Sequence, residues 1–373
     1  MQRPDLNTMV VVGTRPEAIK MAPVIHEFKK RRRCCLHVVN TAQHRDLVDQ
    51  AFSMFGLNAD SDLNLMEKDQ TLLSLLTKGS EAFEQTLIAH KPDVLLVEGD
   101  TTTVFFASLM AFYHKVDVAH VEAGLRTADI YSPFPEEVNR RITSVVTTLH
   151  FAPTEWAKKN LLREGHRESD IYITGNPVID AFLEVLEMEP CFSEILNSID
   201  FDRFKVILVT AHRRENHGKP LENICRAILQ LRDTFEDILF LYPVHPHPMV
   251  ENIVQPLLSG KQRIIVVPPL DYLSFVHLMK RSHLILTDSG GIQEEAPSIG
   301  KPTLVLRNTT ERPEAIDAGT AKVIGTETEN IVREVSSLIS DEVKYRNMTT
   351  KRNPFGDGNA AKRIVDIVLE RYG

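Results

Sequence analysis

Short runs of Val, Ile and Leu alternate with longer amphipathic segments along the whole chain, and this alternation is the feature that most limits its fold. Runs that are apolar on both faces are typical of strands in a parallel sheet, and the amphipathic segments between them supply the covering helices. The predicted strands are 9–12, 36–41, 94–97, 118–121 and 171–174, followed by 206–210, 238–242, 264–267 and 284–287. The pattern therefore predicts an α/β fold built on parallel sheets.

The alternation pauses at Gly175, Asn176 and Pro177, because glycine and proline continue neither a helix nor a strand. A chain of 373 residues has room for two domains of ordinary size, so we place one domain at 1–175 and a second at 176–356. A final amphipathic segment, 359–372, predicts a helix that docks on a domain core. Its apolar face comprises Ala361, Ile364, Val365, Val368 and Tyr372.

Composition and charge argue against several classes of protein. The formal net charge of −8 argues against a nucleic-acid partner, and we interpret the basic run at 29–33 as the C-terminus of a helix. No apolar run approaches the roughly 20 residues of a membrane span, and the N-terminal sequence lacks an export signal, so we expect a cytoplasmic protein without a membrane partner. The four cysteines, and His245 with His247, lack the spacing of a disulfide framework or a metal site.

The segment 287–312, TDSGGIQEEAPSIGKPTLVLRNTTER, carries the strongest signal for a ligand. A buried strand ends at its start, and Gly290 and Gly291 open the following helix, where unpaired N–H groups could hold a phosphate. Glu295, one turn into that helix, could accept two sugar hydroxyls, and Arg312 could close on the phosphate. A tight strand-to-helix turn is the alternative interpretation of the glycine pair.

Charged side chains also follow three strands predicted for the first domain. Arg15 and Lys20 come after the first strand, while Asp100 and Glu122 directly follow strands 94–97 and 118–121. Because parallel sheets place ligands outside the carboxyl ends of their strands, both acids could point to one site. The alternatives are a capped turn with surface charges around Arg15, and an N-cap at Asp100 for the threonine run that follows it.

Two further segments offer groups for proton transfer. Glu136 begins a helix behind a rigid, proline-flanked entry, although a glutamate there is also a common partner of the helix dipole. His212 and Arg213 follow strand 206–210, a combination that suits an anionic substrate needing proton transfer. The sequence contains no G-x-G-x-x-G fingerprint of a dinucleotide-binding domain.

Eight motifs stand in one order along nearly the whole chain, and together they resemble the non-hydrolysing UDP-N-acetylglucosamine 2-epimerases of bacteria. They are GTRPEAIKMAP, GDTTT, HVEAGLRT, PFPEEVNRR, TAHRREN, LTDSGGIQEEAPS, TTERPEA and NPFGDG. The resemblance implies a fold like that of the GT-B glycosyltransferases. Two Rossmann-like domains would face each other across a cleft that holds the active site, and a C-terminal helix, 357–373, would return to the first domain.

The resemblance also implies roles for individual residues. The catalytic positions of the family fall on Asp100, Glu122, Glu136 and His212. Its substrate-binding positions fall on Arg15, Lys20, Arg213, Phe275, Ser289, Gly290, Gly291, Glu295 and Arg312.

The sequence departs from the family at two positions near these motifs. Glu98 stands where a histidine often precedes GDTTT, and Leu270 stands where several members have a glutamine near the uracil. The resemblance implies that Leu270 would weaken one contact to the nucleotide.

A regulatory site is implied for some members, which bind a second UDP-N-acetylglucosamine as an activator. Gln43, Arg213 and His245 fit that site in this sequence. Asp46 and Asp69 replace residues that are polar or basic in those members, and their negative charges would repel a pyrophosphate. These two acids argue against activation by the substrate.

The activity expected from the resemblance is reversible epimerisation at C2 of UDP-N-acetylglucosamine, giving UDP-N-acetylmannosamine through release and re-addition of UDP. UDP-N-acetylglucosamine and UDP are the expected ligands, a homodimer is the expected assembly, and neither a metal nor a nicotinamide cofactor is required. The alternatives are a hydrolysing 2-epimerase that releases N-acetylmannosamine, a GT-B glycosyltransferase, and a non-catalytic sensor of nucleotide sugars.

Overall fold

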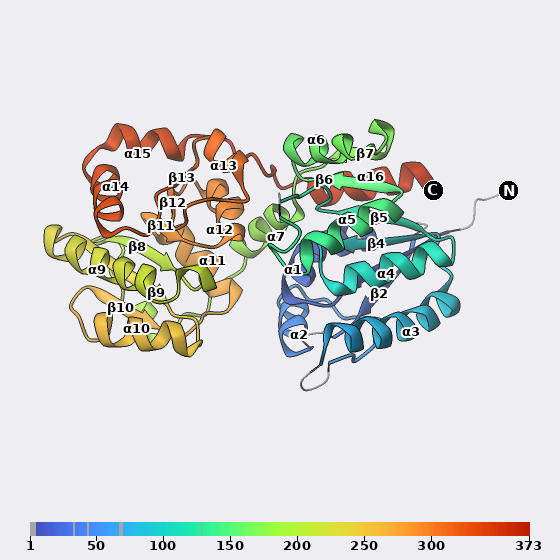
Figure 1. Ribbon diagram of the computed structural model, residues 1–373, viewed down its shortest axis with the longest axis horizontal. Coiled ribbons are helices and arrows are strands. Elements are labelled where there is room, and N and C mark those ends of the chain that lie inside the picture. The colour runs from blue at the N-terminus through green and yellow to red at the C-terminus, as the bar shows by residue number, and fades with distance from the viewer. Residues whose placement is uncertain (1–4, 33, 43–44, 67–69, 128) are drawn as a thin grey trace. The chain divides into compact units, whose positions relative to one another are not determined.

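The computed structural model describes residues 5–32, 34–42, 45–66, 70–127 and 129–373 of the chain. The chain forms two compact units, the first comprising Met1–Glu184 with Phe355–Gly373 and the second comprising Val185–Pro354. Figure 1 labels the helices and strands of each unit. The units divide inside helix α7 (Pro177–Leu186), which begins directly after the expected boundary at Gly175 and Asn176.

The first unit is built on a seven-stranded parallel sheet in the order β3-β2-β1-β4-β5-β6-β7. Its strands are β1 (Leu6–Val12), β2 (Cys34–Asn40), β3 (Ser61–Asp62), β4 (Val94–Glu98), β5 (Asp117–Val121), β6 (Leu149–Ala152) and β7 (Ile171–Ile173). The strands predicted for this part of the sequence are confirmed to within a few residues. The sequence pattern missed β3, which has only two residues, and β6, where the buried His150 interrupts the apolar run.

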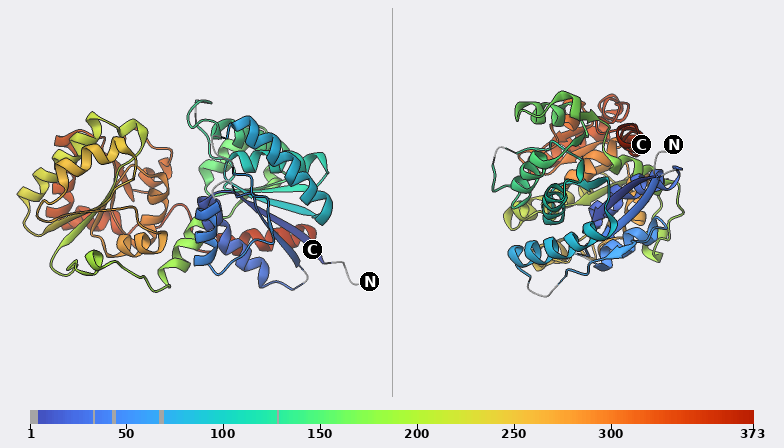
Figure 2. Two further views of the ribbon diagram at one scale, coloured as in Figure 1. Left: turned by 90° about the horizontal axis from the view of Figure 1, so that it is seen from below. Right: turned by 90° about the vertical axis from the view of Figure 1, so that its right-hand side faces the viewer.

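Helices cover both faces of this sheet, and the left view of Figure 2 shows α1 and α16 on one face and α3 and α4 on the other. The helices are α1 (Arg15–Lys29), α2 (Arg45–Met54), α3 (Leu72–His90), α4 (Thr102–Tyr113), α5 (Glu136–Val146), α6 (Glu155–Arg163), α7 and α16 (Ala360–Tyr372), with a 3-10 turn η1 (Glu168–Asp170). The basic run that begins at Lys29 follows the end of α1, as predicted.

The C-terminal helix α16 belongs to the first unit, as the resemblance implied. The backbone N–H groups of Ala360 and Ala361 donate to the carboxylate of Asp180 on α7, over 3.2 and 2.9 Å. At the other end, the Tyr372 hydroxyl donates to Asp117 on β5 over 2.8 Å. The predicted apolar face is buried except at Tyr372, which is half-buried because its hydroxyl reaches a surface carboxylate.

The second unit is built on a six-stranded parallel sheet in the order β10-β9-β8-β11-β12-β13. Its strands are β8 (Lys205–Thr210), β9 (Ile238–Pro243), β10 (Ile264–Val267), β11 (Leu284–Thr287), β12 (Thr303–Val305) and β13 (Ala321–Val323). The first four confirm the prediction, whereas β12 and β13 have three residues each and were not predicted. Both are too short to produce a clear apolar run.

The helices of the second unit are α8 (Glu194–Asn197), α9 (Lys219–Thr234), α10 (Pro248–Leu258), α11 (Tyr272–Arg281), α12 (Gly290–Glu295), α13 (Pro313–Asp317), α14 (Thr328–Ser340) and α15 (Glu342–Thr349), with 3-10 turns η2 (Arg214–Asn216) and η3 (Ala296–Ile299). Side chains from α9, α10 and α14 share one apolar core with β8, β9 and β11. The two units thus have separate cores, as expected from the interrupted alternation.

The turn between β1 and α1 shows why the chain needs a glycine and a buried glutamate there. A Cβ atom on Gly13 would collide with the hydroxyl of Thr103, so only glycine fits. The Glu17 carboxylate accepts the N–H groups of Gly13 and Thr14 over 2.6 and 2.8 Å, and the Thr101 hydroxyl over 2.5 Å. This capping box fixes the start of α1 against the start of α4.

Candidate functional site

The carboxyl ends of β1, β4 and β5 are neighbours in the first unit, because β4 pairs with both of the other strands. The residues that follow these ends are therefore close together. Lys20 on α1 donates to Oε1 of Glu98, the last residue of β4, over 2.8 Å, and to Oε2 of Glu122, just after β5, over 2.5 Å. The structure thus brings Lys20 and Glu122 together as predicted, and it adds Glu98, a buried carboxyl group that the sequence analysis did not place in the site.

Glu122 is held in an unusual backbone conformation. Its φ of 62° lies in the left-handed region, where a residue with a side chain costs about 1 kcal/mol or more. The side-chain amide of Asn176 donates to Oε1 of Glu122 over 3.0 Å, while Lys20 holds the other carboxylate oxygen. Strain that is retained in a buried acid, and compensated by two donors, is typical of a functional position.

Asp100 is fixed from the helix α5. Arg140 lies 2.8 Å from its Oδ2, and the Asn139 side chain donates to its backbone carbonyl over 3.0 Å. The alternative interpretation of Asp100 as a helix N-cap is wrong, because the N-cap of α4 is Thr101, whose hydroxyl accepts the N–H of Val104. The Asp100 side chain keeps about a quarter of its surface exposed (28%), so it remains accessible to a ligand.

Glu136 and Arg15 begin helices beside this group. Both side chains are half-buried, and within the described residues neither has a hydrogen bond or ion pair that would occupy its charge. The neighbouring Glu137, which the sequence analysis passed over, is fully buried and bound to Arg141 over 2.7 Å and to the Thr127 backbone N–H over 3.0 Å. Glu137 therefore holds the loop in place, while Glu136 and Arg15 keep their charges available.

The second unit has a cationic cradle at the start of α12, the helix predicted to open at the glycine pair. Ser289 is the N-cap, and its hydroxyl makes no capping bond to the helix. A Cβ atom on Gly290 would lie 3.7 Å from Nη2 of Arg312 and 3.8 Å from Nη2 of Arg213, so two guanidinium groups converge on that glycine. Gly291 is exposed beside it. Backbone N–H groups and two cations at one point can attract an anion.

Arg312 is oriented from behind by a buried acid. Its Nε donates to Oε1 of Glu294, which is almost fully buried on α12. Arg213 lies 3.7 Å from the carboxylate of Glu311, which also approaches Arg312. Glu294 and Glu311 fix the directions of the two guanidinium groups. The Nη2 atom of each guanidinium is then the one that lies near Gly290.

His212 lies at the end of β8, above the buried Asp288. One oxygen of Asp288 accepts the backbone N–H groups of His212 and Arg213, each over 2.8 Å, and the side-chain amide of Asn216 over 3.0 Å. The other oxygen, Oδ1, has no hydrogen-bond partner within the described residues and lies 3.8 Å from Nδ1 of His212. Sequence reasoning missed Asp288, although its place between β11 and the glycine pair was a usable signal.

Glu295 and Phe275 lie on neighbouring helices of the second unit. Glu295 is nearly buried, and its Oε1 accepts the hydroxyl of Tyr272 on α11 over 2.7 Å. Phe275 is half-buried one turn further along α11. Tyr272, which was not predicted, therefore orients the carboxylate expected to accept sugar hydroxyls.

The residues of the predicted regulatory site are only partly described. Gln43 and Asp69 lie outside the described residues, and Asp46 is exposed on α2. The ring of His245 stacks on that of His212 in the second unit, with centroids 5.3 Å apart and planes inclined by 14°. Burial lowers the pKa of His245, so this ring supplies no permanent positive charge at neutral pH.

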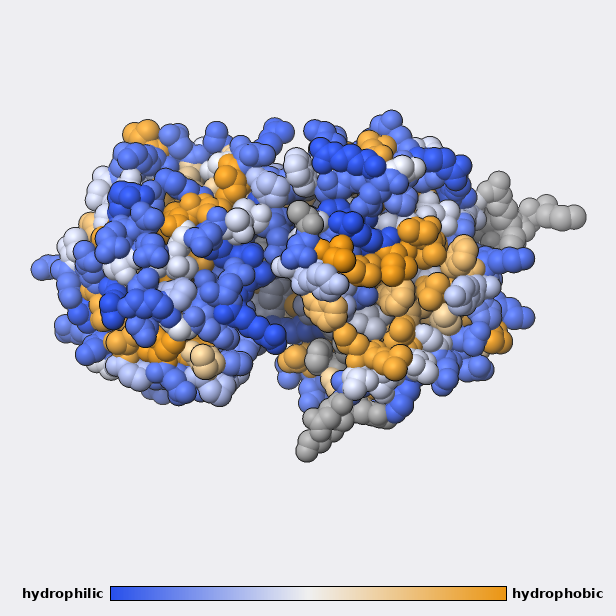
Figure 3. All heavy atoms as spheres, in the orientation of Figure 1, coloured by the Kyte–Doolittle hydropathy of each residue, from blue (hydrophilic) through white to orange (hydrophobic). Residues whose placement is uncertain are grey.

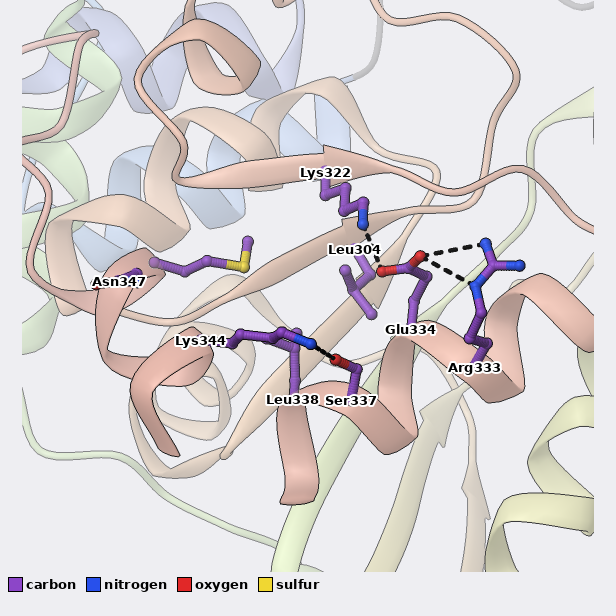
Figure 4. A pocket seen from close by; sticks show the side chains of 9 residues that line it. Leu304, Lys322, Arg333, Glu334, Ser337, Leu338, Lys344 and Asn347 are labelled. Carbon is purple, nitrogen blue, oxygen red and sulfur yellow. Dashed lines mark hydrogen bonds and ion pairs between the residues drawn. The ribbon is translucent and has the colours of Figure 1, made fainter. Parts of the chain in front are cut away.

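A pocket of about 420 Å³ lies elsewhere in the second unit, beside β12, β13, α14 and α15. Figure 4 shows that its polar side chains are paired with one another: Glu334 binds Lys322 and Arg333, and Lys344 binds Ser337. The pocket shares no residue with the predicted site, and each of its charged side chains already has a hydrogen-bond partner within the pocket. We therefore do not assign the ligand site to it.

Two searches over the described residues gave negative results. They contain no group of three or more His, Cys, Asp and Glu side chains arranged to hold a metal ion. No described helix combines the length and the apolar composition needed to cross a membrane.

Comparison with known proteins gives the same assignment along the whole chain. A sequence model described as UDP-N-acetylglucosamine 2-epimerase matches residues 26–369. The chain is 50% identical over 370 residues to the UDP-N-acetylglucosamine 2-epimerase of Neisseria meningitidis, covering 98% of this chain and 100% of the relative. A sequence identity of this size over full length shows common ancestry and a common fold.

Comparison with solved structures leads to the same family. The crystal structure of UDP-GlcNAc 2-epimerase from Neisseria meningitidis bound to UDP-GlcNAc has a TM-score of 0.90 and 49% identity, covering 98% of this chain and 100% of that one. The S. aureus MnaA–UDP co-structure has a TM-score of 0.89 and 46% identity, covering 98% of this chain and 96% of that one. Both neighbours share the fold of this chain over nearly its whole length. The chain therefore belongs to the UDP-N-acetylglucosamine 2-epimerase family.

Proposed function

We propose that this chain catalyses the reversible epimerisation of UDP-N-acetylglucosamine at C2, giving UDP-N-acetylmannosamine without hydrolysis. The observation that carries the proposal is the convergence of Asp100 and Glu122 at adjacent strand ends, because inversion at a carbon atom requires acids that remove and return a proton. The relatives at about half identity bear the name of this activity.

The nucleotide half of the substrate is assigned to the second unit. We assign the pyrophosphate to the cradle of Ser289, Gly290, Gly291, Arg213 and Arg312, where two cations meet backbone N–H groups. Glu295, oriented by Tyr272, is assigned to the ribose hydroxyls, and Phe275 to the uridine. Support comes from two homologous structures, one bound to UDP-GlcNAc and the other to UDP.

The acids of the first unit are assigned to the sugar. The hydrogen at C2 lies next to an acetal carbon without a carbonyl group, so a carboxylate cannot remove it directly at a reasonable rate. Breaking the bond between C1 and the pyrophosphate oxygen develops positive charge at C1 and makes the C2 proton acidic. One of Asp100, Glu122 and Glu136 then takes this proton, UDP departs, and 2-acetamidoglucal remains.

The reverse steps give the new configuration. A second acid delivers a proton to C2 from the opposite face, and UDP adds back to C1. We assign Arg15, Arg312 and His212 to the stabilisation of the negative charge of departing UDP, as preorganised donors do in many enzymes. The same groups serve both directions, so the reaction is reversible.

Nuclear magnetic resonance of the reaction in deuterated water tests this assignment. We expect UDP-N-acetylmannosamine that carries deuterium at C2, with UDP-N-acetylglucosamine remaining at equilibrium. Free N-acetylmannosamine with UDP as the only products would instead indicate the hydrolysing relative. Transfer of the sugar to an added acceptor would indicate a glycosyltransferase, and the absence of any product would indicate a sensor.

We further propose that the enzyme is a homodimer formed through the first unit. Val138, Ile142 and Val145 form a stripe on α5, and Phe112 and Tyr113 are exposed at the end of α4, which packs against α5. Figure 3 shows hydrophobic side chains gathered over this face of the first unit. An apolar patch of this kind on a monomer is unusual, and a two-fold axis would bury it against itself.

Sedimentation velocity tests the dimer. Val145→Glu should yield monomers, because it places a charge in the apolar patch, at a side chain that is 77% exposed in the wild type. Val343→Glu is the matched control, since Val343 is 70% exposed on α15 of the second unit. Monomeric wild-type protein, or a dimer that survives Val145→Glu, would contradict this interface.

The substrate and product are nucleotide sugars, so we place the enzyme in the cytoplasm. Immunoblots of fractionated cells test this location.

A further inference from the structure

Three ionisable side chains of the first unit form a buried group. Lys20 bridges Oε1 of Glu98 and Oε2 of Glu122, at 2.8 and 2.5 Å. Glu98 is 1% exposed at the end of β4, and Glu122 is 7% exposed after β5. One ammonium group therefore faces two carboxyl groups away from bulk water.

The other charged groups described near Glu98 and Glu122 either have partners of their own or are neutral. Glu17, on the same helix as Lys20, directs its carboxylate to the turn at Gly13 and to Thr101. His120, on β5, contacts the Gly99 carbonyl over 2.7 Å, and burial lowers the pKa of His120 to about 4, so the ring is neutral at pH 7. Asp100 and Arg140 form their own ion pair. If both Glu98 and Glu122 were ionised, these two side chains and Lys20 would together carry a net negative charge.

An uncompensated charge in a buried site costs several kcal/mol, whereas binding one proton removes it. The hydrogen-bond donors decide which carboxyl group takes the proton. Glu122 receives donors on both oxygens, from Lys20 and from the Asn176 amide over 3.0 Å, and donors stabilise the ionised form. Among the described residues, Lys20 donates the hydrogen bond that Glu98 accepts, and the other side-chain partner of Glu98 is Glu122 itself.

We propose that Glu98 is a positioning residue that retains a proton at neutral pH, so that the adjacent Glu122 keeps the negative charge required of a base. Here the role of Glu122 rests on the proposed epimerase function, whereas the proton on Glu98 follows from the geometry alone. A protonated Glu98 donates to Glu122, and Lys20 binds both, so the group is electrically neutral. Loss of the Glu98 proton at alkaline pH places a second negative charge beside Glu122 and disturbs the pair.

The direction in which the pKa of Glu98 is shifted agrees with a proton on this carboxyl group. Burial raises the pKa of Glu98 well above its usual range, the attraction of Lys20 opposes this, and the repulsion of Glu122 raises it again. Because the two carboxyl groups interact strongly, they titrate as a pair.

Infrared difference spectroscopy of the wild-type protein without substrate tests the proton directly. We expect the carbonyl stretching band of a buried, protonated carboxyl group at pH 7, which disappears as the pH rises and is missing in Glu98→Gln. Asp180→Asn is the matched control, because Asp180 is another buried carboxyl group of the same unit and its pKa is raised by burial to about 6. The proposal would be overturned if the wild-type spectrum at pH 7 shows no such band. It would also be overturned if the band persists in Glu98→Gln.

The pH profile of kcat/KM provides a second readout. Glu98→Gln is isosteric with the protonated acid, so it should keep activity at pH 7 within about threefold and shift the alkaline limb upward by about one pH unit or more. Asp180→Asn should leave that limb unchanged. An unchanged profile in Glu98→Gln, or a loss of about 100-fold at pH 7 with an intact melting temperature, would overturn the role of Glu98.

The two measurements separate this inference from the proposed function. If the infrared band is present and no epimerase activity is found, the proton on Glu98 stands and the function of Glu122 is wrong. If activity is found and the band is absent, the epimerase stands and the proton on Glu98 is wrong. If Glu98→Gln fails to fold, the pH titration of the band in the wild-type protein still decides.

Discussion

The change Gly290→Ala should weaken UDP binding while leaving the second unit folded. The new Cβ would lie 3.7 Å from Nη2 of Arg312 and 3.8 Å from Nη2 of Arg213, both ordinary van der Waals distances within the protein. A phosphate oxygen bound by these cations needs to approach each nitrogen to about 2.8 Å, so the methyl group occupies the space that the anion requires. The substitution thus removes the ligand position without a clash in the free protein.

The expected loss follows from the contacts that the anion must give up. A hydrogen bond to a charged group contributes about 1.5–3 kcal/mol, so losing one such contact raises Kd by about 10- to 150-fold. The free energy of unfolding should rise slightly, by up to about 1 kcal/mol, because alanine restricts the unfolded chain more than glycine does in a helix.

Titration calorimetry with UDP measures the first quantity, and urea unfolding measures the second. Arg312→Ala, which removes one cation and leaves Gly290 unchanged, should weaken UDP binding by a similar factor. A Gly290→Ala protein that is as stable as the wild type and binds UDP equally well would refute the assignment of the pyrophosphate to this cradle. A protein that loses stability as well would show that Gly290 has a structural role instead.

Three further predictions concern other acids of the two units. Glu122→Gln and Asp100→Asn should lower kcat by about 10²- to 10⁴-fold, with the Kd of UDP within a few fold by calorimetry, and a large drop in melting temperature would contradict a catalytic role. Asp288→Asn should lower kcat/KM by about tenfold or more by weakening the orientation of His212, and unchanged kinetics would refute that role. Burial raises the pKa of Asp180 to about 6 from 3.8, so folding stability from this group is present at low pH and lost as the pH rises towards 6. Urea unfolding should therefore show Asp180→Asn gaining up to about 3 kcal/mol relative to wild type between pH 4 and 7, and a constant difference would contradict the shift.

The fold was largely accessible from the sequence because the strands of a parallel sheet are buried on both faces. Nine runs of Val, Ile and Leu predicted nine strands, and each is present. Of the four strands that were missed, β3, β12 and β13 have two or three residues each, and β6 carries a buried histidine. A run of two or three residues is too short to show a periodic pattern of apolar residues. Such strands are recognised by their hydrogen bonds to a neighbouring strand rather than by their own composition.

The candidate site was accessible wherever a charged residue follows a predicted strand. Asp100, Glu122 and His212 were found in this way, because the carboxyl edge of a parallel sheet collects such residues. The sequence did not indicate which residues hold them. Arg140 reaches Asp100 from α5, and Asn176 reaches Glu122 from beyond β7, and both contacts join residues that are far apart in the chain.

Glu17, Glu98 and Glu122 show why residue type alone does not assign chemistry. All three are buried glutamates near the same sheet edge, yet their backbone positions give them different partners. Glu17, in the first turn of α1, is bound to the N–H groups of the turn that it caps, so it serves the fold. Glu98 is the last residue of a strand and points to Lys20 and Glu122, where two carboxyl groups share one ammonium group. Glu122 lies one step beyond its strand, has donors on both oxygens, and is the most exposed of the three. The donors, and not the amino-acid type, determine which of these acids carries charge at neutral pH, and therefore which one is able to act as a base.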